Sequence, residues 1–268
     1  MFRTIKLIVA YDGASYVGWQ RQENGKSIQA YVEEAIELVE GRHVGIISAG
    51  RTDAGVHAIG QVASVQMHSE IGAAALVRAL NASLPRDIRI LQAQEAASDF
   101  NARRAVKTKH YRYRIVVGDS ISPFEYRYAW HVTQNLDCSA MLSAGALLEG
   151  EHDFAAFQAA HSSVKTTLRR ILRLEISRCS LGDRTIDPFP VVDGSLVTID
   201  IKGNGFLRHM VRIIVGTLVD IGAGRRPPES IKHIIQNRDR SEAGPTAPAR
   251  GLFLVRVCLL YTSPSPRD

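Results

Sequence analysis

The chain has 268 residues, of which 45% are hydrophobic and 22% are charged, with a net charge of +6 and a pI of about 9.4. This length can form one large domain or two ordinary ones, and the composition excludes a disordered or fibrous protein. The positive charge favours an anionic partner such as a nucleic acid. Because the three cysteines are widely spaced, they indicate neither a disulfide framework nor a zinc site, and we expect a cytoplasmic protein.

The apolar segments are too short for a membrane protein. The run Ile5–Ala10 is followed at once by Asp12, which is unlike a signal peptide. A membrane-spanning helix needs roughly 18 or more apolar residues, and no stretch of the sequence approaches that. We therefore expect no membrane partner.

The first half of the chain, residues 1–105, predicts the element order strand, helix, strand, strand, helix, strand. Ser27 can cap the first helix, in which apolar residues recur every three or four positions up to Gly41, and Pro85 ends the second. This order is the split βαβ pattern of ferredoxin-like and RRM-like folds, with helices on one face of the sheet. The expected elements are Ile5–Tyr11, 28–40, Val44–Ser48, Gln61–Met67, 72–83 and Ile88–Ala93.

The second half, residues 106–258, roughly repeats this scheme. We therefore expect an α+β fold of two pseudo-duplicated halves that form a mainly antiparallel sheet. The alternation over His110–Val117 is typical of a half-buried strand. Residues 182–194 predict a long exposed loop, and 259–268 a disordered tail. The other expected strands are Tyr128–Val132, 167–178, 195–202 and Leu252–Val257, and the helices are 138–148, 208–222 and 229–237.

The decapeptide Ala49–Ala58 (AGRTDAGVHA) carries the strongest chemical signal. It places Arg51, Asp53 and His57 around two glycines, directly after a short apolar run. Such a turn can bend sharply and aim a carboxylate, although Asp53 could also bond its own backbone or form a surface ion pair with Arg51. Asp53 and His57 do not indicate a metal site, because Gly55 argues against a helix and no third ligand is near.

Arg212 is the second signal, because it stands in the middle of a helix that is apolar on nearly all sides. A buried guanidinium is costly unless a carboxylate pairs with it. Asp220 is about 12 Å away along a helix axis, so we expect an acid from elsewhere in the fold. The alternative is that Arg212 reaches the surface together with Arg208.

Cations and aromatic residues alternate over residues 103–114. Cations bind phosphates and aromatic rings stack on bases, so the pattern favours an RNA or DNA partner. The plainer interpretation is a solvated face of the sheet with tyrosines in the core. Arg169, Arg170 and Arg173 form a second basic group, and Arg225 with Arg226 a third. The first group comprises Arg103, Arg104, Lys107, Lys109, Arg112 and Arg114, interleaved with His110, Tyr111 and Tyr113.

The stretch Ser48–His57 resembles the signature of the TruA family of tRNA pseudouridine synthases. Further similar motifs occur in family order over residues 5–257, and several motifs in register are more specific than one. They are Tyr11-Asp12-Gly13, Gly18-Trp19-Gln20, Phe100-Asn101-Ala102-Arg103, Lys109-His110-Tyr111-Arg112-Tyr113, Asn204-Gly205-Phe206-Leu207 and Met210-Val211-Arg212. Only the 182–194 loop and the terminal tail depart from the family pattern.

The resemblance implies that the protein converts uridine to pseudouridine without a cofactor or a metal. Asp53 matches the essential aspartate, which could attack C1′ of the ribose or take a proton from C2′. Arg212 matches the arginine that pairs with this acid, and Tyr111 matches the tyrosine placed against the base. The active-site cleft is expected between the two halves.

The resemblance also implies the partners. Family members act as homodimers on the anticodon stem-loop of tRNA, at roughly positions 38 to 40, and read the shape of the RNA. Arg51 is suited to steering the flipped nucleotide. The other expected RNA contacts are Trp19, Gln20, His57, Arg103, Lys109, Arg112, Arg169 and Arg208.

Two other classes of function remain. A non-catalytic RNA-binding protein of the same fold would keep the basic groups and could lose Asp53, whose presence with Arg212 and Tyr111 argues against that class. A metal-dependent hydrolase or phosphoryl-transfer enzyme would need more acids or histidines in spaced pairs, and the sequence shows none.

Overall fold

The computed structural model describes residues 2–23, 25–160, 164–181 and 194–260. It divides into two compact units, the first formed by Met1–Lys109 with Phe253–Asp268 and the second by His110–Leu252. The expected exposed loop lies outside the described residues except for Gly194, as does the expected tail from residue 261 onward. Residues 259 and 260 belong to the fold instead of the tail, because Leu259 ends a strand and the Leu260 N–H donates to the Ala105 carbonyl at 2.7 Å.

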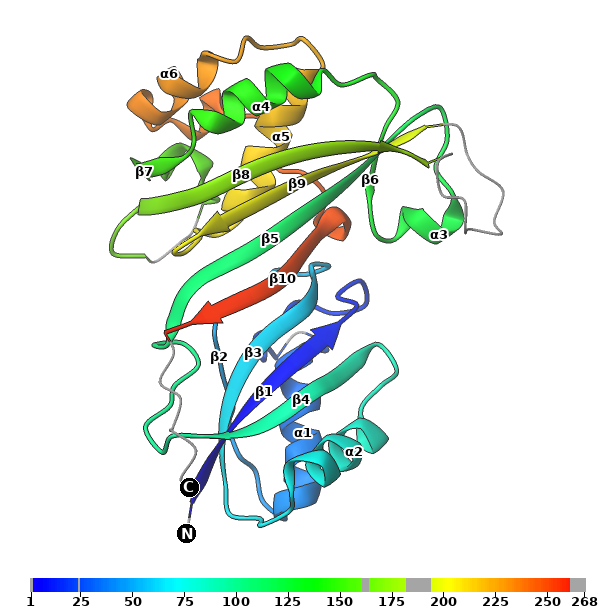
Figure 1. The fold of residues 1–268 in the computed structure, drawn as a ribbon, viewed down its shortest axis with the longest axis vertical. Helices are drawn as coiled ribbons and strands as arrows, with labels where there is room; N and C mark the ends of the chain where they lie inside the picture. Colours follow the sequence, from blue (N-terminus) through cyan, green and yellow to red (C-terminus); the bar gives the residue numbers. More distant parts are fainter. Residues whose placement is uncertain (1, 24, 161–163, 182–193, 261–268) are drawn as a thin grey trace, which may run out of the picture. The chain divides into compact units, whose positions relative to one another are not determined.

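The first unit confirms the predicted split βαβ order. Strand β1 lies between β4 and β3, β2 pairs with β3, and all of these pairs are antiparallel. Helices α1 and α2 lie on the same side of this sheet (Figure 1). The elements are β1 (Arg3–Tyr11), α1 (Ile28–Glu40), β2 (Ile47–Ser48), β3 (His57–Met67), α2 (Ala73–Ser83) and β4 (Ile88–Ala96).

Local sequence explains the elements of the first unit. Alternate residues of β1 are buried, as the two-residue period of a strand requires. The Ser27 side chain accepts a hydrogen bond from the Ala30 N–H and so caps α1, and Gly41 ends the helix at φ 70°. These termini are those that the sequence predicted. Strand β3 begins four residues earlier than expected, so His57 belongs to a strand.

Strand β10 (Leu252–Leu259) belongs almost entirely to the first unit. Phe253 and Leu254 pair in parallel with His57 and Ala58 at the start of β3. The sequence had assigned this strand to the second half, because it follows that half in the chain. A period-two pattern identifies a strand but not its partner, which explains the difference.

The second unit is also α+β. Its strands follow the order β5-β9-β8-β7, with β7–β8 and β8–β9 antiparallel and β6 parallel to β5. Among the residues that the structure describes, the sequence missed β7, α3 and short 3-10 turns such as Ala155–Phe157. The elements are β5 (Val106–Val117, which starts in the first unit), α3 (Pro123–Tyr126), β6 (Trp130–Val132), α4 (Cys138–Ala146), β7 (Gly150–Asp153), β8 (Leu168–Ser180), β9 (Ser195–Gly203), α5 (Met210–Gly222) and α6 (Ser230–Asn237). No helix in the described ranges has both the length and the apolarity to span a membrane.

Helix α5 is the buried centre of the second unit. Every one of its residues is buried except Arg212, which is half-buried. The segment after α6 packs closely against this helix. The Gly244 N–H donates to the Thr217 hydroxyl at 2.9 Å, and a side chain at Gly216 would collide with the Pro245 carbonyl. This packing fixes the helix that carries Arg212.

Trp19 lies in the core of the first unit. Its exposed fraction is 1%, its ring centroid is 5.9 Å from that of Tyr11, and its backbone N–H donates to the Thr52 carbonyl at 3.0 Å. An enclosed ring is at odds with the RNA contact that the sequence suggested, because stacking needs an accessible face. The large apolar ring instead serves packing.

We expect Gly216→Ala to lower the free energy of unfolding by about 2–3 kcal/mol, because the added methyl group would overpack the contact with Pro245. Urea denaturation followed by circular dichroism measures this change. Gly72→Ala is the matched control, because a Cβ at Gly72 meets nothing within 4 Å. Equal stability of the two variants would contradict the close packing of α5.

We expect Trp19→Phe to lower the free energy of unfolding by about 1–2 kcal/mol, because the smaller ring leaves a cavity in the core. The affinity of the folded variant for tRNA, the substrate that the resemblance implies, should not change. Denaturation and filter binding measure the two quantities separately. Weaker tRNA binding at full stability would show instead that the ring reaches the RNA.

Candidate active site

Asp53 lies on the loop 49–56, which joins β2 to β3. The loop leaves β2 through a bond from the Ala49 N–H to the Val62 carbonyl at 2.8 Å. It then turns tightly, because the Val56 N–H donates to the Asp53 carbonyl at 3.1 Å and Gly55 adopts φ 76°. Asp53 is half-buried in this turn, and Arg51 is exposed.

The segment from Tyr11 to Trp19 holds the loop from one side. The Gly55 N–H donates to the Tyr16 carbonyl at 3.3 Å, and the Tyr11 hydroxyl lies 2.8 Å from the Thr52 hydroxyl. Burial raises the pKa of Tyr11 above its ordinary value, so this hydroxyl stays protonated at neutral pH. On the other side of the loop, the Gln61 amide donates to the Gly50 carbonyl at 2.8 Å.

Two glycines allow the backbones of this segment and the loop to touch. A side chain at Gly13 would collide with the carbonyl of Val56. Gly18 adopts φ 109°, and a Cβ there would lie 2.6 Å from the Thr52 carbonyl oxygen. The motif Tyr11–Gly13 thus packs against a residue that follows Asp53 in the sequence. The motif Gly18–Gln20 packs against the residue that precedes it.

His57 is buried at the end of the loop. Its exposed fraction is 1%, and its ring stacks on Phe253 with the centroids 4.7 Å apart. Its Nδ1 atom lies 3.0 Å from Asp12 Oδ1 and 3.1 Å from the Gly13 nitrogen. Like Trp19, His57 is therefore too buried for the RNA contact that the sequence suggested.

Lys109 lies over the loop in the first unit. A Cβ at Gly50 would collide with its Nζ atom, so the ammonium group occupies the space beside this glycine. Gln20 is half-buried, and Arg103 is exposed. In the first unit, Lys109 thus lies beside the loop that carries Arg51 and Asp53.

Tyr111 and Arg212 belong to the second unit. Tyr111 is 7% exposed, and its ring meets Phe206 edge to face with the centroids 5.2 Å apart. The Arg212 Nε donates to the Ala247 carbonyl at 2.7 Å, while the Arg212 carbonyl accepts from the Ala247 N–H at 3.1 Å. These two bonds fix the position of Arg212 and explain how its guanidinium is accommodated in an apolar helix.

Asp200 is a charged group of the second unit that sequence reasoning missed. It is 8% exposed, lies 2.5 Å from His110 Nε2, and accepts two bonds of 3.1 Å from Arg112 Nε. These contacts of Asp200 with His110 and Arg112 tie part of the basic group to strand β9. The sequence feature that could have revealed Asp200 is an acid between two apolar residues, Ile199 and Ile201, in an expected strand.

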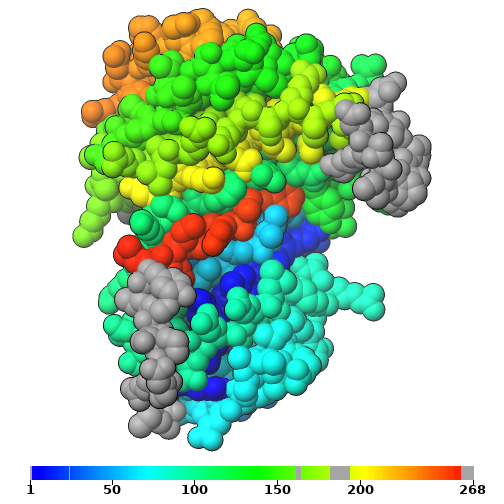
Figure 2. All heavy atoms as spheres, in the orientation of Figure 1, coloured from blue at the N-terminus to red at the C-terminus, as the bar shows by residue number. Residues whose placement is uncertain are grey.

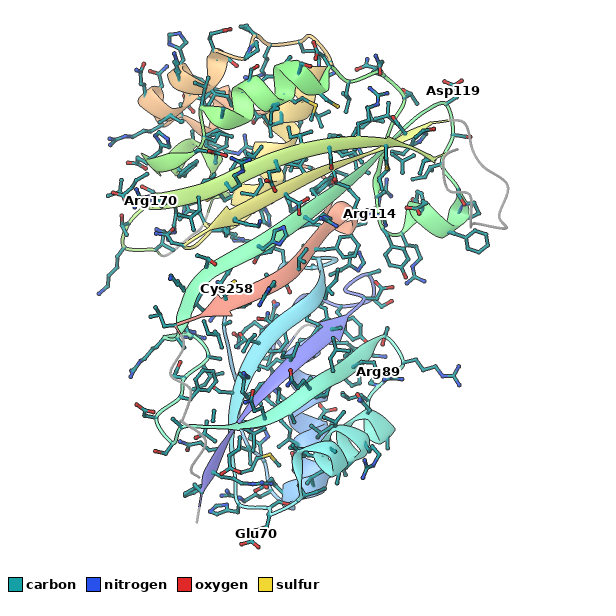
Figure 3. All side chains as sticks on the ribbon, viewed as in Figure 1. Glu70, Arg89, Arg114, Asp119, Arg170 and Cys258 are labelled. Carbon is teal, nitrogen blue, oxygen red and sulfur yellow. The ribbon has the colours of Figure 1, made fainter. Side chains whose placement is uncertain are left out.

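The remaining basic candidates lie near the start of α5 and β8. Arg208 is exposed, and its Nη1 donates to the Ala160 carbonyl at 3.4 Å. Arg169 is half-buried beside Gly205, and burial lowers its pKa. Arg170 projects from the start of β8 (Figure 3). Among residues 2–23, 25–160, 164–181 and 194–260, no cluster of three or more His, Cys, Asp or Glu side chains could hold a metal ion.

Comparisons with known proteins agree with these motifs. The tRNA pseudouridine synthase family matches residues 7–103 and 144–258. The chain is 44% identical to tRNA pseudouridine synthase A of Pelobacter propionicus and 45% identical to that of Geobacter sulfurreducens, over 95% of this chain and 99% of each relative. The protein of the same name from Acetivibrio thermocellus is 42% identical with the same coverage.

Among solved structures, the archaeal box H/ACA sRNP Nop10–Cbf5 complex is 11% identical, with a TM-score of 0.32, over 80% of this chain and 44% of the other. Such a distant likeness carries no inference about this chain. The family match and the close relatives do, because they extend over nearly the whole sequence. The chain therefore belongs to the tRNA pseudouridine synthase family.

Proposed function

We propose that this protein isomerises uridine to pseudouridine in tRNA, with Asp53 as the catalytic carboxylate. The observation that carries the proposal is a half-buried aspartate on a tightly held loop, in a chain that belongs to this family. Its relatives are named tRNA pseudouridine synthase A, which makes tRNA the substrate. The anticodon stem-loop, at roughly positions 38 to 40, is the proposed target.

The reaction breaks the bond from C1′ to N1, turns the uracil and joins C1′ to C5. The hydrogen on C5 leaves as a proton and N1 gains one, so atoms and electrons balance without a redox partner. Asp53 begins the reaction by attacking C1′ or by taking a proton from C2′. We propose that no cofactor and no metal take part.

Arg212 is proposed to pair with Asp53, and Tyr111 to lie against the target base. A guanidinium carries five N–H donors, and the Ala247 carbonyl takes the one on Nε. We assign others to the catalytic carboxylate, which a bidentate arginine would orient. Tyr111 supplies a ring for stacking and a hydroxyl for proton transfer at C5.

Arg51 and the basic residues are proposed to bind the RNA. Arg51 is exposed two residues before Asp53, where it can support the nucleotide once the target base has left its stack. We propose that phosphates meet the exposed Arg103, Arg112 and Arg208 and the half-buried Lys109 and Arg169. Figure 2 shows atoms of β8, the strand that carries Arg169, at the visible surface of the second unit. We further propose a homodimer that works in the cytoplasm.

Asp53→Asn should lower the rate of tritium release from tRNA labelled with [5-³H]uridine by at least about a thousandfold, because the neutral amide neither attacks nor takes a proton. The Kd for tRNA should stay within about twofold. Asp119→Asn is the control, since Asp119 is exposed in the second unit (Figure 3). Wild-type release that a chelator does not change would support the metal-free reaction. Binding without any release by the wild type would favour a non-catalytic RNA-binding protein.

Arg208→Gln should weaken tRNA binding and reduce the slope of log K against log salt by about one, because one phosphate contact is lost. The rate of a single turnover at saturating enzyme should not change. Filter binding between 50 and 200 mM salt measures the slope. Over this range a protein that makes several phosphate contacts loses about a thousandfold or more in affinity. Arg78→Gln serves as the control, since Arg78 is exposed on α2. An unchanged slope would remove Arg208 from the RNA-binding surface.

A further inference from the structure

We infer that His57 and Asp12 form a positioning pair that fixes the loop of Asp53, and that the RNA does not touch His57. The inference rests on the proposed function, because it assigns these residues a role in the rate of that reaction. It concerns residues of the first unit only. The pair explains why the motif around Asp12 and the decapeptide around Asp53 occur together in this chain.

The pair joins the end of β1 to the start of β3. The side chain of His57 is 2% exposed and that of Asp12 18%, so both are largely shielded from water. The His57 Nδ1 lies 3.0 Å from Asp12 Oδ1, and that oxygen also accepts from the Ala14 N–H at 3.0 Å. Stacking on Phe253 holds the plane of the imidazole.

The Nδ1 atom can serve only one of its two neighbours at a time. If it carries a proton, it donates to the Asp12 carboxylate; if it carries none, it accepts from the Gly13 N–H at 3.1 Å. An ionised carboxylate beside a bare lone pair is repulsive, so we favour the protonated Nδ1. In either form Nδ1 bonds to one of two consecutive residues, Asp12 or Gly13, so His57 stays tied to the same segment.

A second bond to the same segment holds the other side of Asp53. The Tyr11 hydroxyl lies 2.8 Å from the Thr52 hydroxyl, immediately before the catalytic residue, whereas His57 is four residues after it. The collision that a Cβ at Gly13 would make with Val56 shows that the backbones also touch near His57. The residues from Tyr11 to Gly13 therefore restrain the loop before and after Asp53.

This restraint affects the reaction more than the binding of tRNA. A catalytic group displaced by about 1 Å can lose about a hundredfold in rate, whereas phosphate contacts elsewhere keep their energy. An RNA contact by His57 would have the opposite effect, since its loss would raise the Kd. The two interpretations therefore differ in a measurable way.

The test is His57→Phe, which keeps a ring for stacking on Phe253 but has no Nδ1. We expect the single-turnover rate of tritium release at saturating enzyme to fall about 10- to 100-fold, with the Kd for tRNA within about twofold of wild type. His57→Asn should recover part of the rate, because its amide can bond Asp12 or Gly13. Tyr11→Phe should lower the rate in the same direction.

His131→Phe is the matched control, because it also removes a hydrogen bond made by a histidine ring, here between Nε2 and the Gly118 carbonyl at 2.8 Å, but in the second unit. Its rate should equal that of the wild type. If His57→Phe does not fold, as judged by circular dichroism, Asp12→Ala replaces it in the same assay.

Three results would overturn the inference. A wild-type rate in the folded His57→Phe variant, or in Asp12→Ala where it takes its place, removes the positioning role. A raised Kd at an unchanged single-turnover rate assigns His57 to RNA binding. A slow His57→Asn that is no faster than His57→Phe shows that packing rather than the Nδ1 bond matters. Absence of release by the wild type would instead refute the proposed function itself, and this inference with it.

Discussion

The close approach of the Tyr11–Trp19 segment to the loop of Asp53 is the constraint on which the candidate active site depends. A carboxylate on an exposed turn would sample many directions, and catalysis needs one of them. Here Gly13 and Gly18 let two backbones touch, and hydrogen bonds to Thr52 and Gly55 close the contact. This packing therefore restrains the orientation of the Asp53 side chain.

The second unit follows the same design around Arg212. The helix that carries it is otherwise buried, so its axis cannot shift without disturbing the core. Gly216 and Gly244 bring the following segment against the helix, and Ala247 bonds both the backbone and the Nε of Arg212. In each unit a candidate catalytic residue is thus a partly accessible polar group on a rigid, buried support.

Much of the fold could be predicted from the sequence because its signals are local. The Ser27 cap, the Gly41 terminus and the alternation in β1 depend on neighbouring residues, and the structure confirms all three. The partner of β10, the depth of Trp19 and the Asp200 pair depend on residues far away in the chain, so composition and period could not show them. Asp53 and Arg212 could be named as candidates because each is a charged residue in an unusual local setting, and they stay predictions.

The residues of the decapeptide differ in burial, and this difference limits the role that each can have. Arg51 is exposed, Asp53 half-buried and His57 enclosed, although all three are polar and lie within seven positions. An exposed cation can meet a phosphate, and a half-buried acid can reach a substrate while its environment directs it. An enclosed imidazole acts through the groups it touches, which here include Asp12, Gly13 and Phe253. Burial thus separates the proposed roles in binding, chemistry and positioning within one short stretch of sequence.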